Sequence, residues 1–181
     1  MSQDDGRWAA AFPALFADRY VDYADCWTWF TTGSVPDELV ARLHVVAVTP
    51  RGHVIACRSI QGWRFLPGGT REEGETLGEL ARRELLEEAG ARITGSVDVF
   101  ASHVADSVRE RPFRPHLPHP RAYWGYAVAE AEVVQPPTNP HDGEHVVEVL
   151  TLPPAEAADY IEEHDQVHAD VVRLAQAMVL V

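Results

Sequence analysis

The chain has 181 residues, of which 46% are hydrophobic and 24% are charged, and its formal net charge is −13. A length of this order fits one domain with an extra terminal element, and it is sufficient to bury a sizeable core. The acidic balance argues against nucleic acid or an anionic membrane as the main partner, because both attract basic surfaces. A phosphorylated small molecule is still compatible with it, since a bound metal ion inverts the local field.

Two further features bear on the cellular compartment. Cys26 and Cys57 lie far apart and have no metal-binding spacing, which is typical of reduced thiols in the cytosol. No basic segment followed by an apolar one opens the chain, and no run of about 18 apolar residues occurs. We therefore expect a cytoplasmic protein with no membrane partner.

Residues 1–40 are rich in aromatic side chains, and several of these recur at a spacing that predicts a helix. The positions with this spacing are Phe12, Phe16, Tyr20 and Tyr23. Residues 27–32 are predicted to form a short strand. We interpret residues 1–40 as an extension packed on a core domain of residues 41–181. The alternative is that the extension forms a wall of the substrate pocket.

Three strands are predicted in the next segment. Residues 43–49 form a continuous apolar run, and residues 53–58 form a second one. Pro50-Arg51-Gly52 between them is a turn signal, so the pair is predicted to form a hairpin. Residues 63–66 predict a third strand, which ends at Pro67-Gly68-Gly69.

The following helix has a recognisable beginning and end. Thr76-Leu-Gly-Glu79 has the form of a capping box, and helix-forming residues continue to Ala89. Gly90 stands where a left-handed residue commonly ends a helix. A small apolar stripe that can pack on the core consists of Ala81, Leu85 and Ala89.

Strands continue to alternate with helices in the second half of the chain. The predicted elements are strands over residues 93–104, 122–134 and 145–152, a helix from Pro154 to about Glu163, and a last helix over residues 166–180. Such alternation predicts a mixed sheet between helices. The apolar face of the last helix is either a homodimer interface or part of the core; it consists of Val167, Val171, Leu174, Ala175 and Met178.

The most informative feature is the acidic cluster Glu84, Glu87 and Glu88. Positions i, i+3 and i+4 share one face of a helix, where like charges repel and weaken the helix. A cation that neutralises these carboxylates would explain the arrangement. Carboxylate oxygens are preferred ligands of Mg²⁺ and Mn²⁺, so the cluster points to metal-assisted chemistry on an anionic substrate.

The stretch from Gly69 to Ala91 resembles the Nudix box, G-x5-E-x7-R-E-U-x-E-E-x-G-U, in which U is a bulky aliphatic residue. All positions are in register except the last, where Ala91 replaces the aliphatic residue. The matching positions are Gly69, Glu75, Arg83, Glu84, Leu85, Glu87, Glu88 and Gly90. The resemblance implies a Nudix-type α/β/α sandwich with a mixed sheet, an N-terminal extension and an additional C-terminal helix.

The resemblance also implies an activity and a set of site residues. Nudix enzymes hydrolyse a nucleoside diphosphate linked to another group, and water attacks phosphorus with the help of Mg²⁺ or Mn²⁺. By position in the box, Glu87, Glu88 and the carbonyl of Gly68 are expected metal ligands. Glu84 is a further ligand or the general base, and Arg83 is expected to orient the glutamates. Glu75 resembles a structural partner of the loop.

Family members often use another acid from a later loop, and Glu144 stands where that acid is expected. Its rivals as ligand or base are Glu130, Asp142 and Glu148. A Pro-rich, basic loop over residues 109–121 contains arginines that suit phosphate oxygens. The predicted substrate-binding residues are Arg64, Arg114, Arg121 and Tyr123.

The substrate itself stays open at this point, because we find no signature outside the box that selects one. Candidates are an ordinary or oxidised nucleoside triphosphate, a nucleotide sugar and a capped nucleotide. The first alternative to a hydrolase is a Nudix-like sensor that binds a nucleotide without cleaving it. An isomerase on the same fold is the second, although it would require other catalytic residues.

Overall fold

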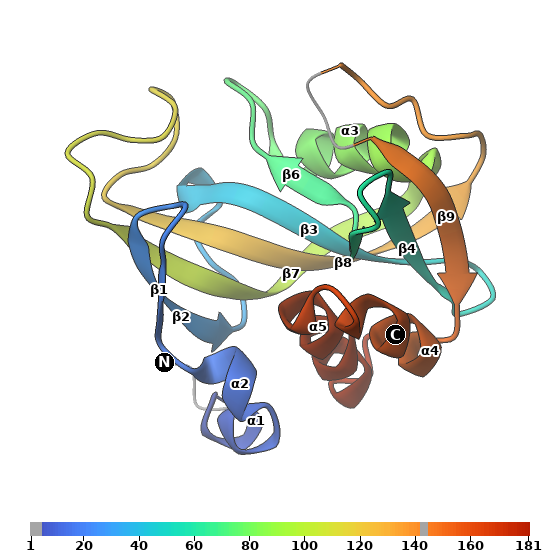
Figure 1. Cartoon of the computed structure of the whole chain (residues 1–181), viewed down its shortest axis with the longest axis horizontal. Helices are drawn as coiled ribbons and strands as arrows, with labels where there is room; N and C mark the ends of the chain where they lie inside the picture. The colour runs from blue at the N-terminus through green and yellow to red at the C-terminus, as the bar shows by residue number, and fades with distance from the viewer. Residues whose placement is uncertain (1–4, 142–144) are drawn as a thin grey trace.

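The computed structural model describes residues 5–141 and 145–181. Within these ranges, nine strands form one mixed sheet with helices on both faces (Figure 1). The strands are β1 (Arg19–Val21), β2 (Cys26–Thr32), β3 (Val40–Val48), β4 (Val54–Ser59), β5 (Arg64–Phe65), β6 (Gly68–Thr70), β7 (Ala91–Ser107), β8 (Arg121–Val133) and β9 (Val146–Leu152). The helices are α1 (Asp5–Ala11), α2 (Pro13–Phe16), α3 (Leu77–Ala89), α4 (Pro154–Glu162) and α5 (Gln166–Ala177), with a 3-10 turn at Asp37–Leu39. The predicted α/β sandwich with a mixed sheet is confirmed.

The sheet divides at the hairpin between β3 and β4. The main strand order is β1-β2-β7-β8-β3-β4-β5, in which β3 and β8 are parallel. β3 and β4 are paired only at Val48 and Val54, beside the turn closed by the Thr49 amide and the His53 carbonyl at 2.8 Å. Beyond that point β6 pairs with β3, and β9 pairs with β4. The predicted hairpin is therefore confirmed only at its turn, and its divergence makes room for β6.

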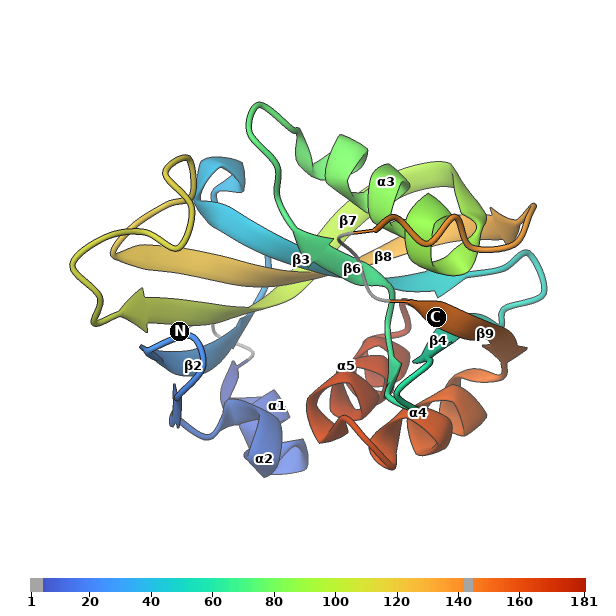
Figure 2. The same cartoon turned by 45° about the horizontal axis from the view of Figure 1, so that its top comes forward.

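Two apolar layers pack the sheet against its helices. Leu80, Leu85 and Ala89 of α3 bury one face of that helix against strand residues on the upper side. α4 and α5 cover the lower side, as the two views of the ribbon show (Figures 1 and 2). The apolar face predicted for the last helix packs in this lower layer, so it is occupied within the chain.

The helix predicted from the spacing of the N-terminal aromatics is wrong beyond Phe16. Ala17 adopts an extended conformation and ends α2, and Arg19–Val21 then pairs with the start of β2. Tyr20 packs its ring on Trp27 across this hairpin, with centroids 5.4 Å apart. The four-residue spacing from Phe16 to Tyr20 therefore does not mark a continuous helix, since Tyr20 finds its ring partner across the hairpin instead.

The N-terminal segment contributes to the same core as the rest of the chain. Trp8, Leu15 and Phe30 are buried in the lower layer together with residues of α4 and α5. β2 pairs along β7 from Cys26 to Thr32, as predicted for a short strand in this region. The N-terminal elements thereby extend the sheet and add an outer wall to it.

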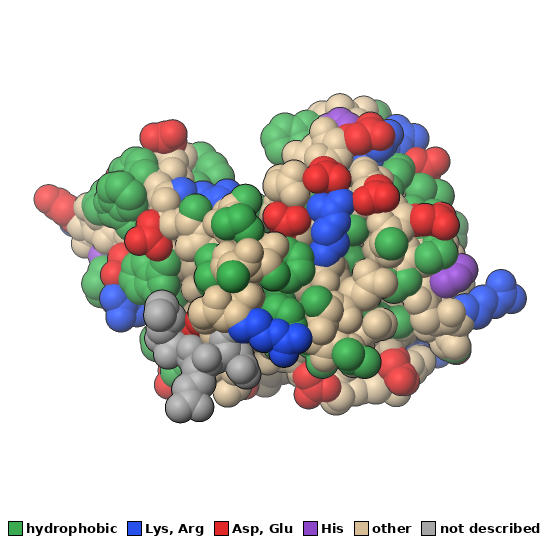
Figure 3. All heavy atoms as spheres, turned by 90° about the horizontal axis from the view of Figure 1, so that it is seen from below, with side chains coloured by type: hydrophobic (Ala, Val, Ile, Leu, Met, Phe, Trp, Pro, Cys, Tyr) green, Lys and Arg blue, Asp and Glu red, His purple; other side chains and the backbone are tan. Residues whose placement is uncertain are grey.

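Seen from below, charged side chains of both signs alternate over the right half, and hydrophobic ones are more prominent on the left (Figure 3). Arg173 of α5 forms ion pairs with three acids of the C-terminal helices, namely Asp159, Glu162 and Asp170. No helix among the described residues is long and apolar enough to cross a membrane.

Packing of α3 on the sheet can be tested with two adjacent leucines. Leu85 is fully buried, whereas Leu86 is 40% exposed. We expect Leu85→Ala to lower the free energy of unfolding by about 2–5 kcal/mol, because it removes apolar contacts and leaves a cavity. Leu86→Ala should lower it by less than about 1 kcal/mol. Urea denaturation measures both, and equal losses would contradict this packing of α3.

A buried histidine predicts how stability depends on pH. Burial lowers the pKa of His103 to about 3, and the Arg19 charge contributes in the same direction. In the unfolded chain the histidine pKa is about 6.5, so below that pH the unfolded chain binds a proton that folded His103 does not bind. The free energy of unfolding therefore falls as pH drops below about 6.5. Between pH 7 and pH 5 His103 should remove about 2 kcal/mol of unfolding free energy.

Denaturation of His103→Phe at both pH values provides the test. This variant should lose about 2 kcal/mol of the pH dependence and keep the part that comes from His44 and His168, whose pKa values burial also lowers, whereas a variant of an exposed histidine, His164→Gln, should keep all of it. An unchanged pH dependence in His103→Phe would contradict the assignment.

Candidate active site

The acidic helix α3 is fixed at both ends by contacts that its sequence predicts. The Thr76 hydroxyl accepts the Glu79 amide at 3.2 Å, and the Glu79 carboxylate accepts the Thr76 amide at 2.8 Å, which completes the capping box. Gly90 has φ +59° and ends the helix in the left-handed conformation. A side chain there would collide with the Gln135 carbonyl. These ends determine which helix face presents the carboxylates.

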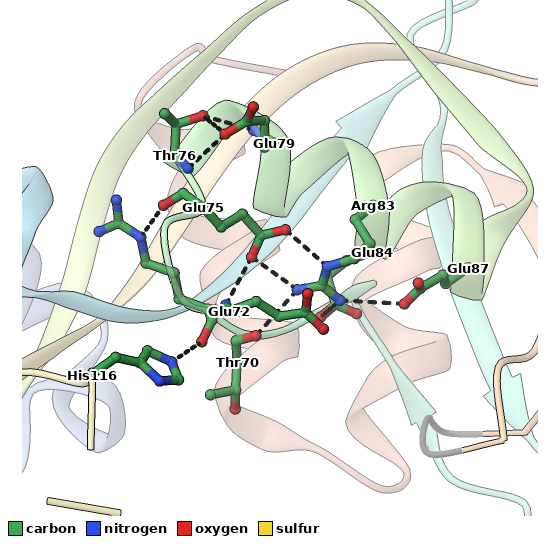
Figure 4. A network of polar contacts seen from close by, with 10 residues as sticks. Thr70, Glu72, Glu75, Thr76, Glu79, Arg83, Glu84, Glu87 and His116 are labelled. Carbon is green, nitrogen blue, oxygen red and sulfur yellow. Dashed lines mark hydrogen bonds and ion pairs between the residues drawn. The ribbon is translucent and has the colours of Figure 1, made fainter. Parts of the chain in front are cut away.

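Arg83 is the centre of the polar network (Figure 4). Its Nε and Nη2 donate to the two oxygens of Glu75 at 2.8 and 3.1 Å. Its Nη1 donates to Glu84 at 2.8 Å and to Glu87 at 3.3 Å. Its Nη2 also reaches the Thr70 carbonyl of β6 at 3.2 Å. One guanidinium therefore holds three carboxylates and attaches the helix to the neighbouring strand.

Glu75 connects this network to the loop that precedes the helix. Its carboxylate also accepts the Glu72 amide at 2.9 Å, and its carbonyl accepts Arg71 Nε at 2.6 Å. Burial by itself would raise the pKa of Glu75, but the hydrogen bonds from Arg83 and Glu72 outweigh it and lower that pKa. Glu75 is therefore ionised at neutral pH and serves as a structural anchor, as its place in the sequence suggested.

Glu84 and Glu88 lie against the Gly68-Gly69 segment of β6. Glu88 accepts the Gly68 amide at 2.8 Å. A Cβ atom at Gly69 would come within 2.2 Å of the Glu84 carboxylate, so the present rotamer of Glu84 requires a glycine there. Both glutamates are 7% exposed. Burial raises the pKa of Glu84, and Arg83 opposes this only partly.

The Gly68 carbonyl lies on an open edge of the strand. The Val45 amide donates to the Pro67 carbonyl at 2.9 Å. In antiparallel pairing, residues that bond to the neighbouring strand alternate with residues whose amide and carbonyl point away from it. Gly68 therefore points its amide and carbonyl away from β3. The amide binds Glu88, and β6 has no other strand partner among the described residues.

This set of oxygen donors fits a hard divalent cation. Glu84, Glu87 and Glu88 supply carboxylates, and the Gly68 carbonyl faces the same edge. Within the described residues, however, no three acidic, histidine or cysteine side chains already form a metal cluster. Glu84 and Glu87 instead share Nη1 of Arg83, so binding one ion together requires rotamer changes of these flexible side chains.

The other predicted site residues that the structure describes form contacts outside this cluster. Glu144 and Asp142 lie outside the described residues. Arg64 contacts α4, where it donates to the Tyr160 carbonyl at 3.2 Å and pairs with Glu163 at 2.6 Å. Glu148 binds Arg58 at 2.8 Å.

The predicted substrate-binding residues of the basic loop and β8 are divided between two regions. Arg121 forms a two-bond ion pair with Asp106 at 2.6 and 2.7 Å, and its guanidinium lies over Trp29. Tyr123 lines a hollow next to α1 together with Arg121. Arg114 is exposed on the loop, with its guanidinium 5.9 Å from the Phe113 ring.

Three histidines contact the backbone around the box, and no motif or spacing in the sequence predicted these contacts. His44 Nδ1 lies 3.3 Å from the Leu66 carbonyl, and the Leu66 amide donates to His168 Nδ1 at 3.3 Å. Two imidazoles from distant segments, His44 partly buried and His168 buried, therefore hold the backbone that leads into Gly68. His116 Nε2 lies 3.0 Å from the Arg71 carbonyl, which brings the Pro-rich loop to the box. Spacing could not reveal these contacts, since each joins residues at least 22 positions apart.

The fold and this arginine-centred acidic helix together are those of a Nudix domain. A family model described as NUDIX domain matches residues 39–175, and the chain belongs to that family. No curated protein sequence matches the chain.

Solved structures of Nudix proteins have the same fold. The Bacillus subtilis pyrophosphohydrolase BsRppH aligns with a TM-score of 0.53 at 16% identity, covering 76% of this chain and 77% of its own. A Nudix hydrolase from Nitrosomonas europaea gives 0.53 at 15% identity, with 76% and 89% covered. The MutT protein from Methanosarcina mazei Go1 gives 0.50 at 18% identity, with 80% and 98% covered. At these identities the likeness shows the fold alone.

Metal binding to the cluster predicts a change in thermal stability. At a hundredfold excess over Kd, Mg²⁺ or Mn²⁺ should add about 2.7 kcal/mol of unfolding free energy. For a chain of this size that corresponds to a rise in Tm of about 5–10 °C. Glu84→Gln should lose at least half of this rise, because it removes a charged ligand. Without metal it should melt no lower than the wild type, because burial of the Glu84 charge opposes folding.

Differential scanning fluorimetry with and without the metals measures these shifts. The matched control is Glu73→Gln, which changes an exposed carboxylate of the loop that precedes α3. It should show the full rise in Tm. Equal rises in Glu84→Gln and Glu73→Gln would contradict a metal site at Glu84.

Proposed function

We propose that the protein is a metal-dependent Nudix hydrolase that cleaves the pyrophosphate bond of a nucleoside diphosphate linked to another group. The observation that carries the proposal is the position of the Glu84 and Glu88 carboxylates at β6, where Gly68 binds Glu88, while Arg83 binds Glu84 and Glu87 on the same helix. Acids that only face solvent on a helix need no glycine-containing strand packed beside them. Here Gly69 leaves space for the Glu84 carboxylate, and the Gly68 amide binds the Glu88 carboxylate.

Each residue has a definable task in this reaction. Glu87, Glu88 and the Gly68 carbonyl would hold Mg²⁺ or Mn²⁺, with Glu84 as a further ligand. The ion, when bound, would neutralise phosphate charge and lower the pKa of coordinated water. Arg83 positions the carboxylates without contacting the substrate, because its donors are occupied by Glu75, Glu84, Glu87 and Thr70. Glu75 in turn orients Arg83.

Glu84 is also the best candidate among the described residues for the general base. Burial raises its pKa, and a carboxylate with a raised pKa takes a proton from water more readily. Its carboxylate lies next to Gly69, where the substrate phosphates would approach the strand edge. The tasks of ligand and base are both compatible with this position.

The non-catalytic sensor is the weaker proposal, because the box retains every acid that hydrolysis needs. The name of the Bacillus subtilis structure, a pyrophosphohydrolase, is in line with a hydrolase. Its 16% identity does not carry its substrate over to this chain. The two proposals differ in one measurable outcome, since a sensor binds nucleotides without releasing phosphate or pyrophosphate.

A Glu88 variant tests the hydrolase directly. Glu88→Gln should lower kcat/KM at least a hundredfold, or about 2.7 kcal/mol of transition-state stabilisation, because it removes a charged metal ligand. Its amide oxygen can still accept the Gly68 amide, so the fold should persist. The measurement is release of phosphate or pyrophosphate from a nucleotide panel with Mg²⁺ and with Mn²⁺.

Glu73→Gln is again the control, and it should hydrolyse the same substrates at the wild-type rate. Full activity of Glu88→Gln would refute the metal assignment. Nucleotide binding by the wild type without any turnover across the panel would favour the sensor.

A further inference from the structure

A pocket of about 320 Å³ lies between the Pro-rich loop and the left end of the sheet. Arg42 of β3 and Trp124 of β8 belong to its floor, and Phe113 and Leu117 of the loop cover it. The loop after β7 and the loop between β6 and α3 project from the sheet at the same end (Figure 1). None of the tasks assigned above to the acidic helix uses this pocket.

The pocket adjoins the proposed reaction site through β6. Thr70 lines its edge, and the Thr70 carbonyl is the one that Arg83 binds at 3.2 Å. Thr70 is opposite Arg42 in the ladder, and Gly68 lies two residues further along, about 7 Å away in an extended strand. His116 holds the loop to the Arg71 carbonyl at 3.0 Å, so the loop closes the pocket next to the box. One substrate can therefore reach both places.

The lining of the pocket suits a planar aromatic group. It combines the rings of Trp124 and Phe113 with Leu117 and three prolines, namely Pro112, Pro118 and Pro120. None of the described residues that line it is an aspartate, glutamate, asparagine or glutamine. Hydrogen-bonding side chains line the pocket as well, among them Thr70, Ser107 and His119, so a base can pair its polar edge there while its faces lie against aromatic rings.

Arg42 supplies an uncommitted donor at the floor of the pocket. Its guanidinium lies 5.6 Å from the centre of the Trp124 ring, and no described residue accepts a hydrogen bond from it. It forms no ion pair with any described acid, although the chain has a net charge of −13. Arg109, by contrast, is held by the Tyr23 carbonyl at 2.9 Å. A half-buried guanidinium without an acceptor is costly, so a ligand acceptor in the pocket that Arg42 lines explains its retention.

We infer that this pocket binds the nucleobase of the substrate, and that recognition rests on the base rather than on the second group linked to the diphosphate. The base packs on Trp124 under the loop, and Arg42 donates to an acceptor of its ring. The phosphates then extend along β6 to the edge at Gly68. This inference rests on the proposed function, because it assumes that the diphosphate lies at the acidic helix.

Binding of nucleoside monophosphates tests the inference without any turnover, since they have no pyrophosphate bond. Isothermal titration calorimetry with Mg²⁺ compares AMP, GMP, CMP and UMP with ribose 5-phosphate, which lacks the base. At least one nucleotide should bind tenfold or more tightly than ribose 5-phosphate. Trp124→Ala and Arg42→Gln should abolish that preference. Trp63→Ala and Arg51→Gln, which change exposed residues outside the pocket, should retain it.

A second variant guards against loss of folding in Trp124→Ala. Ala122→Leu adds bulk inside the pocket without removing a contact there, and its Tm shows whether the fold is intact. A folded Ala122→Leu protein should also lose the preference for the base. Retention of the preference in that variant overturns the inference, and so does a wild type that shows no preference, including one with no measurable nucleotide binding.

These experiments can refute the proposed hydrolase activity and the proposed base pocket independently of each other. Base binding without hydrolysis would refute the hydrolase and leave the pocket assignment intact. Hydrolysis without a preference for the base would refute the pocket assignment alone.

Discussion

The attachment of Arg83 to its carboxylates is the interaction on which the site depends. Glu84, Glu87 and Glu88 share a helix face on which like charges repel, and burial of Glu84 adds a desolvation cost. Arg83 offsets part of this repulsion, and Glu75 holds the guanidinium from the preceding loop. The same guanidinium binds the Thr70 carbonyl, so the acidic face is fixed against β6 before any metal ion arrives.

The divergence of β3 and β4 determines where this chemistry can occur. Had these strands paired along their whole length, β6 would have no edge of β3 to bind, and Gly68 would not face open space. The short segment before Gly68 is held in addition by His44 and His168 from opposite halves of the chain. Core packing, sheet topology and two imidazoles thus combine to place the Gly68-Gly69 backbone beside the carboxylates of Glu84 and Glu88.

The box and the pocket divide the work of catalysis and recognition in the proposed enzyme. The acidic helix acts on phosphorus and is indifferent to what the phosphates carry. The pocket beneath the Pro-rich loop has rings and a free arginine donor instead of acids, so it is suited to a base. The basic residues first considered for phosphate binding are mostly committed elsewhere, as Arg64 is to Glu163 and Arg121 is to Asp106.

The sequence by itself determined the α/β class, the family and both ends of the acidic helix, because capping residues, glycines and box spacing are local signals. It also predicted most strands to within a few residues. It failed at Tyr20 and Tyr23, because Tyr20 pairs in a strand with Trp27 and Tyr23 lies in the turn of that hairpin. Only the tertiary structure decided which groups Arg83 binds, that Arg64 of β5 binds the Tyr160 carbonyl of α4, and that Trp124 and Arg42 share a pocket with the loop. Those contacts join distant segments, and no local pattern encodes the path of the chain between them.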